Sequence, residues 1–206
     1  MGKYRYFCGS NKSKCMFASP EDFLLKPEYF NHPSDLHGFK HTYRVMCHVL
    51  IIGNEMQLER EKRLAFCAAF VHDMARNHDG FSLRHGPRAA KEKVPLFVDM
   101  FCRNGVAEED IDAIKLAVAN HSQYSEIDKK NPDYNVVALL KDADALDRIR
   151  LGNGNLNEKY LRFEVSKKLI VFAEKLFRVS DKMKDLTFME MKKVGEKILG
   201  KGILGL

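Results

Sequence analysis

Apolar residues recur along most of this chain at steps of three and four, which is the spacing of a helix with one buried face. No segment alternates convincingly with the period of two that indicates a half-buried strand, and glycine and proline fall mostly between the periodic segments. The pattern therefore predicts an all-α fold, a compact helical bundle. We expect helices at residues 36–56, 60–75, 87–104, 108–123, 134–150, 157–178 and 185–199.

The ends of these helices and the domain limits follow from local signals. Ser34 and Asp35 are of the types that cap helix N-termini, and Gly105 is of the type that follows a helix C-terminus. No internal repeat is present, so we expect one domain over residues 1–206, with a core at about 35–175. Residues 1–33 are expected to be irregular, and residues 180–206 to form a C-terminal helix and tail that can dock on a partner.

The helix expected at 60–75 ends in a histidine followed by an aspartate. Its sequence from residue 63, RLAFCAAFVHDMA, is apolar or small on nearly every side, which is typical of a helix inside the core. His72 and Asp73 should therefore lie at a buried end. A buried carboxylate costs several kcal/mol unless it is paired or binds a metal. Asp73 thus either pairs with a neighbour such as Arg76 or belongs to a site.

Histidines also lie on the apolar face of the first helix, where His37, His41, Val45, His48 and Ile52 form one stripe. His41 and His48 are two turns apart, about 10 Å along the axis, so both cannot bind one metal ion. His48 is predicted to be a packed core residue. His37, near the expected cap, is predicted to face solvent.

Two later helices end their apolar stripes in the same way. Ile111, Ile114, Val118 and His121 share one face of the fourth. The fifth, NVVALLKDADALDRIR, carries three aspartates, and at about 100° per residue Asp142 and Asp144 must face nearly opposite directions. The phase of Val137 and Leu140 directs Asp144 into the core; Asp142 and Asp147 are either solvated charges or residues that support a site.

Four helices thus each direct an imidazole or a carboxylate toward the core. Neutral imidazoles and ionised carboxylates on rigid elements are what a nitrogen and oxygen metal site requires. A metal ion would also supply the positive charge that buried Asp73 and Asp144 need.

The order His41, then His72 and Asp73, then Asp144 resembles the H...HD...D signature of the HD-domain superfamily of metal-dependent phosphohydrolases. The strings HGFKHTYRV, AAFVHDMAR and LLKDADALDRIR are similar to the helices that carry this signature. The similarity extends over roughly residues 35–175, where YLRFEVSKKLIVFAEKLF resembles the later helices of the family. The chain looks like a free-standing member.

The resemblance implies one or two divalent metal ions, with manganese, iron, nickel, cobalt, zinc and magnesium all open. The core ligands would be His41, His72, Asp73 and Asp144. His85 and His121 stand where some members carry extra ligands, which would give two metals bridged by Asp73; His85 can alternatively contact phosphate. His78 is expected in an exposed loop.

The reaction that this site implies is hydrolysis of a phosphate ester by a metal-activated water. Asp73 would bind metal and orient that water, and cations would stabilise the phosphoryl oxygens. Arg76 and Lys141 are the catalytic candidates, with Arg44 and Arg148 also near, although each can instead form a surface ion pair. We expect a phosphomonoesterase or phosphodiesterase acting on a nucleotide or another small phosphate ester. A diiron oxygenase of the same family and a non-catalytic module that binds an anion or a partner are the alternatives.

Composition and charge agree with a cytoplasmic protein that binds a small anion. The chain has 34 Lys and Arg against 28 Asp and Glu, a net charge of +6, but the basic residues are too scattered for a specific nucleic-acid signal. No apolar run approaches the roughly 18 residues of a membrane span, and the N-terminus MGKYRY lacks a secretory signal. The five cysteines, an odd number that includes Cys8 and Cys15, are interpreted as reduced, mostly packed thiols. A homodimer is compatible with all of this.

Overall fold

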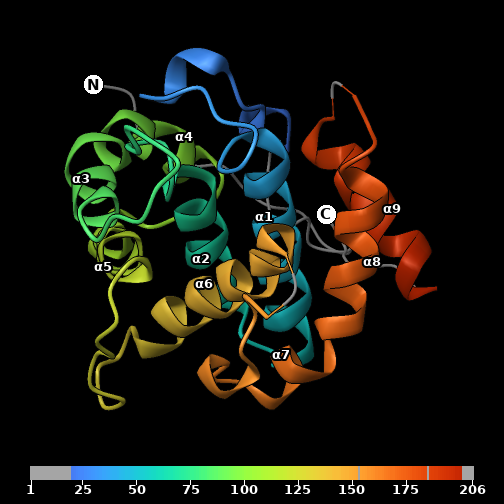
Figure 1. Cartoon of the computed structure of the whole chain (residues 1–206). Helices are drawn as coiled ribbons and strands as arrows, with labels where there is room; N and C mark the ends of the chain where they lie inside the picture. The colour runs from blue at the N-terminus through green and yellow to red at the C-terminus, as the bar shows by residue number, and fades with distance from the viewer. Residues whose placement is uncertain (1–19, 153, 185, 201–206) are drawn as a thin grey trace, which may run out of the picture.

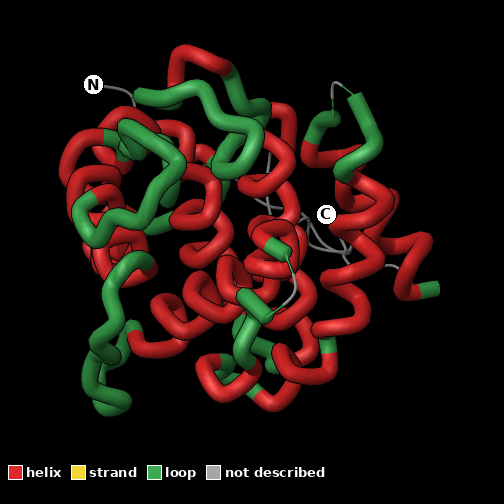
Figure 2. Tube along the Cα trace, viewed as in Figure 1, coloured by secondary structure: helices red, strands yellow, loops and turns green. Residues whose placement is uncertain are grey.

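Three helices pack against one another in the middle of the computed structural model: α1 (Phe39–Glu55), α2 (Glu59–Val71) and α6 (Tyr134–Leu146) (Figure 1). The structure describes residues 20–200 except 153 and 185. Within these residues there is no strand, and helices account for most of the chain (Figure 2). The predicted all-α fold is confirmed. Because α1 is buried at every position from His41 to Gly53, its polar side chains must find partners inside the protein.

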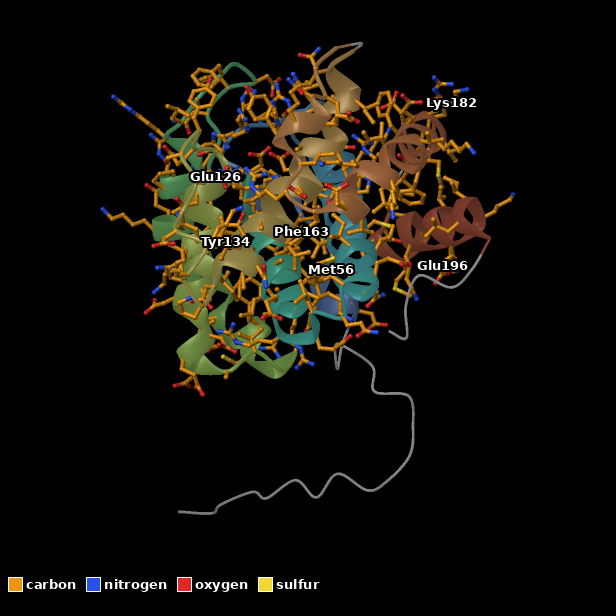
Figure 3. The ribbon with its side chains drawn as sticks, turned by 90° about the horizontal axis from the view of Figure 1, so that it is seen from below. Met56, Glu126, Tyr134, Phe163, Lys182 and Glu196 are labelled. Atoms are coloured by element: carbon orange, nitrogen blue, oxygen red, sulfur yellow. The ribbon has the colours of Figure 1, made fainter. Side chains whose placement is uncertain are left out.

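Two groups of helices flank this centre on opposite sides (Figure 1). One group consists of α3 (His85–Glu92), α4 (Val98–Arg103) and α5 (Ile111–His121). The other consists of α7 (Glu164–Lys168), α8 (Ile170–Ser180) and α9 (Phe188–Leu199). The view from below has Glu126 on the side of the first group and Glu196 on the side of the second (Figure 3). Short 3-10 helices occur in the connections: η1 (Pro20–Phe23), η2 (Pro27–Tyr29), η3 (Val94–Phe97), η4 (Glu108–Asp110), η5 (Asp147–Leu151) and η6 (Glu158–Tyr160).

Aromatic side chains join both ends of the described chain to α2. The Phe23 ring packs edge-on against Phe66 and Phe70 of α2, with centroids 5.0 and 5.5 Å apart. Phe188, at the start of α9, packs against the same Phe66 at 5.1 Å. The core therefore includes residues before and after the central helices, from Phe23 to Met191.

Two predicted helices are each broken in the structure. The helix expected at 87–104 is interrupted by η3, which contains Pro95, because proline has no N–H and its ring clashes with the preceding helical turn. The helix expected at 157–178 begins only at Glu164 and divides between α7 and α8 at Leu169. The cause of the late start is Asp142, whose buried carboxylate accepts hydrogen bonds from the backbone N–H groups of Arg162 and Phe163.

The start of α1 also differs from the prediction. Ser34 Oγ accepts from the N–H groups of Leu36 and His37 and closes a turn before the helix, which begins at Phe39 with Gly38 in the N-cap position. Asp35 does not cap it. A Cβ on Gly38 would lie 2.1 Å from the backbone oxygen of Ser34, so this tight turn requires glycine. The stop after α4 was predicted correctly: Gly105, with φ +87°, follows its C-cap residue.

Three of the five cysteines lie in the described part of the chain. Cys47 and Cys67 are buried free thiols and Cys102 is a half-buried one, as predicted, whereas Cys8 and Cys15 lie outside the described residues. The tail from residue 201 also lies outside them. In the portion that the structure covers, no helix is both long and apolar enough to cross a bilayer.

Candidate metal centre

The carboxylate of Asp73, in the turn directly after α2, lies among buried imidazoles, four of which face it through Nε2. Its Oδ2 is 3.4 Å from His41 Nε2 and 3.7 Å from His72 Nε2. Its Oδ1 is 3.1 Å from His85 Nε2 and 3.6 Å from His121 Nε2. The two carboxylate oxygens therefore face two separate histidine pairs, and Asp73 stands between them.

Helix ends bring these side chains together. His85 is the first residue of α3 and His121 is the last residue of α5. The two helices approach closely at Gly86, where a Cβ would lie 2.5 Å from Ser122 Oγ and 2.8 Å from the backbone oxygen of Val118. The glycine that follows His85 thus permits the contact that places His85 Nε2 2.9 Å from His121 Nε2.

Hydrogen bonds on the far side of each ring determine which nitrogen carries the proton. Each Nδ1 meets an oxygen that can only accept, so each Nδ1 is protonated and each Nε2 presents a lone pair to the cluster. The acceptors are Asp147 Oδ2 for His41 at 2.7 Å, Ala69 O for His72 at 2.7 Å, Ser82 O for His85 at 2.9 Å and Val118 O for His121 at 2.6 Å.

This arrangement leaves lone pairs facing each other. The Nε2 atoms of His41 and His72 lie 3.1 Å apart, and the Nε2 atoms of His85 and His121 lie 2.9 Å apart. Two such nitrogens cannot hydrogen-bond to each other, so a cation between them is needed to make the arrangement favourable. The donor set therefore fits divalent metal.

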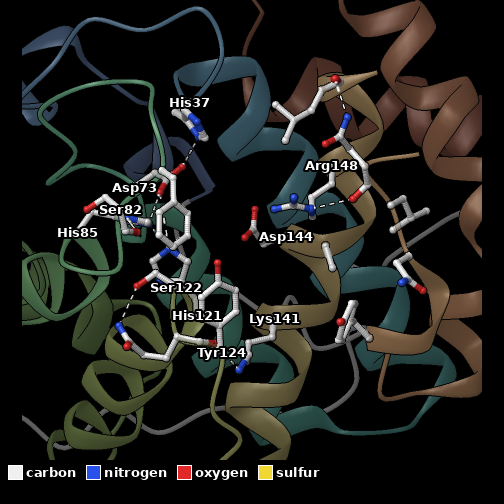
Figure 4. A pocket seen from close by; sticks show the side chains of 18 of the residues that line it. His37, Asp73, Ser82, His85, His121, Ser122, Tyr124, Lys141, Asp144 and Arg148 are labelled. Carbon is white, nitrogen blue, oxygen red and sulfur yellow. Dashed lines mark hydrogen bonds and ion pairs between the residues drawn. The ribbon is translucent and has the colours of Figure 1, made fainter. Parts of the chain in front are cut away.

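Asp144 of α6 completes the first histidine pair. Its Oδ1 lies 3.4 Å from His41 Nε2, and His41, His72 and Asp144 together form a group whose ligand atoms lie within 4.8 Å of one another. The close view shows Asp144 directed toward the space that Asp73 and His121 also border (Figure 4). The Asp144 side chain is 25% exposed, so this side of the group of histidines and aspartates is accessible to solvent.

Burial determines the charge states in the cluster. It lowers the pKa of His72 from 6.5 to about 3, and it also lowers the pKa of His85. Burial alone would raise the pKa of Asp73, but the surrounding imidazoles, His72 foremost, hold that pKa well below its ordinary value. At neutral pH His72 and His85 are therefore neutral and Asp73 is ionised, which is the state that metal binding requires of these groups.

A comparison with protein-family models matched the HD domain over residues 38–149, more than half of the chain. The chain belongs to the HD-domain family. HD domains bind divalent metals, and most members of the family are hydrolases. The chain matched none of the curated proteins and none of the solved structures with which it was compared.

Two aspartates of this HD domain whose roles the sequence left open are fully buried and paired. Asp147 accepts from His41 Nδ1 and from Arg44, whose Nε lies 2.5 Å from Asp147 Oδ1. Asp142 accepts from Arg162 and faces away from the cluster, in agreement with the helical phase that selected Asp144. Arg44 is 2% exposed and is therefore unavailable to a phosphate, so its consideration as a phosphate contact was wrong.

The prediction that His37 faces solvent was also wrong. The residue is 7% exposed, and its Nδ1 lies 2.9 Å from Asp73 Oδ2 (Figure 4). His37, His41 and Asp73 form another group with the spacing of metal ligands. The apolar stripe that His37 shares with His41 indicates this inward position, whereas its nearness to the expected cap does not.

Two other histidines lie where the sequence predicted. His48 is fully buried in the core, where its Nδ1 lies 3.2 Å from the backbone oxygen of Ala143. His78 is exposed in the irregular segment between α2 and α3.

A cavity of about 640 Å³ opens from the candidate metal centre of the HD domain. Arg76 borders it, and its Nε donates to Asp73 Oδ1 at 2.9 Å. Lys141 also borders it, while its Nζ donates to the backbone oxygens of Gln123 and Ser125 at 3.0 Å. Three further cations line the cavity: Arg148, which was a candidate from the sequence, and Arg150 and Arg162, which were not.

Proposed function

We propose that this protein is a metal-dependent phosphohydrolase that hydrolyses a small phosphate ester, as a phosphomonoesterase or phosphodiesterase, with a nucleotide as the favoured substrate. The proposal rests on one observation: Asp73 and the histidines around it lie beside a cavity that five cationic side chains line. Metal ligands alone would suit many reactions, whereas the cations supply what the phosphoryl oxygens require.

We assign two metal positions on the two sides of Asp73. His41, His72 and Asp144 would hold one ion with Asp73 Oδ2, and His85 and His121 would hold the other with Oδ1. A bound divalent ion would supply an activated water and would polarise the phosphoryl group. Asp147 and the backbone carbonyls keep the imidazole rings in the required orientation.

The cations of the cavity have distinct partners and therefore distinct roles. Arg76 is tied to Asp73 and to the backbone oxygen of Gly80, so it would hold Asp73 in place and present its remaining N–H groups to the substrate. Lys141 holds the loop after α5 and faces the cavity with Glu126 3.1 Å from its Nζ. Arg148 donates its Nε to the backbone oxygen of Asn155, and within the described residues its other N–H groups have no partner and can meet an anion.

An exposed aromatic pair at the cavity supports a planar group in the substrate. Phe81 and Tyr124 come from the segments after α2 and after α5 and are 72% and 80% exposed. Their rings stack with centroids 5.8 Å apart and planes at 20°. Large exposed rings beside a reactive centre offer a flat surface for a nucleobase, and for this reason we favour a nucleotide.

Elemental analysis of the purified protein, followed by a screen of phosphomonoesters and phosphodiesters, tests the proposal. We expect stoichiometric divalent metal and hydrolysis of at least one ester. Asp73→Ala should lose both, because it removes the carboxylate shared by the two histidine pairs. Asp112→Ala removes an aspartate that is 88% exposed on α5 and is the matched control.

The proposal is wrong if the wild type binds metal but hydrolyses no ester that Asp73→Ala leaves intact. Iron in the protein together with dioxygen uptake would instead favour the oxygenase alternative.

A further inference from the structure

A second, smaller cavity of about 200 Å³ lies beside the candidate metal centre, between the turn after α2 and the start of α3. Its lining includes three arginines, Arg76, Arg84 and Arg88, and one exposed histidine, His78. None of the described residues that line it carries a carboxylate. Arg76 is paired with Asp73, at 2.9 Å, whereas Arg84 and Arg88 add two positive charges to the same concave space, which favours an anion there.

Within the part of the chain that the structure describes, the guanidinium groups of two of these arginines have no partner. Arg84 and Arg88 are one turn apart, at the N-cap and within α3, so both side chains lie on the same side of the helix. Neither guanidinium forms a hydrogen bond or an ion pair with any residue between 20 and 200 that the structure describes. By contrast, Arg60 binds two aspartates and Arg162 binds two carboxylates. The donors of Arg84 and Arg88 are therefore available to a ligand.

Arg76 is held in a fixed position at the border of the two cavities. Its Nε donates to Asp73 and its NH1 donates to the backbone oxygen of Gly80 at 3.1 Å. A guanidinium has five N–H donors, so these two bonds leave others for an anion. A fixed donor loses little conformational entropy when a ligand binds.

We propose that this second cavity binds a phosphoryl group through Arg76, Arg84 and Arg88. Guanidinium groups match the tetrahedral oxyanion with paired N–H donors, which is why arginine is common in phosphate sites. The phosphoryl group can belong to a free phosphate ion, or to a longer ligand whose other end lies at the metal cluster, since Arg76, Ser82 and His85 border both cavities. The site does not depend on the proposed hydrolase activity.

Isothermal titration of inorganic phosphate into the protein as purified, with its metal, tests the site. We expect the double variant Arg84→Gln/Arg88→Gln to bind one phosphate fewer per chain, or to bind it about tenfold more weakly or worse, because two charged donors are lost. The control is Lys91→Gln/Lys129→Gln, which removes two exposed charges outside both cavities. Unchanged melting temperatures would show that both double variants fold.

Arg148→Gln separates the two cavities, because Arg148 borders only the larger one. It should leave the phosphate in the second cavity bound. The proposal is wrong if the wild type binds no phosphate, if Arg84→Gln/Arg88→Gln binds it like the lysine control, or if only Arg148→Gln loses it.

Tripolyphosphate then identifies the source of the phosphoryl group. If Arg84→Gln/Arg88→Gln and Arg148→Gln both weaken its binding, one molecule spans the two cavities. If only the first variant weakens it, the second cavity holds a separate anion. Either result supports the site, and equal binding by the wild type and Arg84→Gln/Arg88→Gln contradicts it.

Discussion

At the scale of single residues, two aspartates of one helix have different tasks. Asp142 is fully buried and receives hydrogen bonds from two backbone N–H groups and from the Arg162 side chain. Asp144, two positions later, is partly exposed and lies among the histidines. The first carboxylate therefore attaches the segment before α7 to α6, and the second belongs to the candidate metal centre.

Substituting each of these aspartates by asparagine should separate stability from metal binding. Asp142→Asn leaves Arg162 without its buried charge partner and should lower the free energy of unfolding by about 2 to 4 kcal/mol, with metal content unchanged. Asp144→Asn should lower metal content while the metal-free protein keeps its stability within about 1 kcal/mol. Chemical denaturation measures the free energy of unfolding of both variants, and elemental analysis measures their metal content. Loss of metal in Asp142→Asn but not in Asp144→Asn would contradict the assignment.

At the scale of elements, the contact between α3 and α5 positions two of the four histidines of the candidate metal centre. The two helices approach at Gly86, and His85 and His121 meet as a result. Neither helix is long, so their relative position depends on this packing more than on the stiffness of either one. The distance between the two imidazoles is therefore a property of a helix pair.

Gly86→Ala should weaken the metal position formed by His85 and His121. The added methyl group must displace Ser122 or the backbone of α5, and we expect metal affinity there to fall about 10- to 100-fold, as when the supports of a ligand are disturbed. Titration of metal into chelator-treated protein measures it, and the position of His41 and His72 should retain its affinity. Gly80→Ala is the control, since its Cβ would meet only the His78 side chain, at 3.1 Å. Equal affinities in the two variants would contradict the role of this contact.

At the scale of the whole molecule, the core also contains a buried histidine that lies outside the candidate metal centre. His48 is fully buried, and its Nε2 has no hydrogen-bond partner within the described part of the chain. Burial lowers the pKa of His48 from 6.5 to about 4. Between these values the unfolded state binds the proton and the folded state does not, so this residue makes the fold less stable as the pH falls through that interval.

His48→Leu should therefore reduce the sensitivity of the fold to acid. Between about pH 7 and pH 4, the wild type should lose up to about 3 kcal/mol more of its free energy of unfolding than the variant, because each unit of pKa shift corresponds to about 1.4 kcal/mol. Urea denaturation at a series of pH values measures the difference. His78→Gln, at an exposed histidine, should behave like the wild type; parallel curves for the wild type and His48→Leu would contradict the expectation.

Much of the fold and of the candidate site could be predicted because both depend on helical periodicity. The stripes of α1, α5 and α6 placed His41, His121 and Asp144 on inward faces, where the structure has them. The breaks within predicted helices were missed, although Pro95 marked one of them locally. The late start of the helix expected at 157–178 is caused by the hydrogen bonds from residues 162 and 163 to Asp142, across 20 and 21 positions of sequence, and no local pattern contains them.

The sequence by itself determined that this protein is helical and which residues are equipped to bind metal, because the side-chain types and their phase on a helix are local properties. Only the tertiary structure decided that His37 turns inward to Asp73, that Arg44 pairs with Asp147 and that the two histidine pairs face opposite oxygens of one carboxylate. These facts depend on how helices from distant parts of the chain pack, and packing is decided by the shape and charge of all the contacting surfaces together.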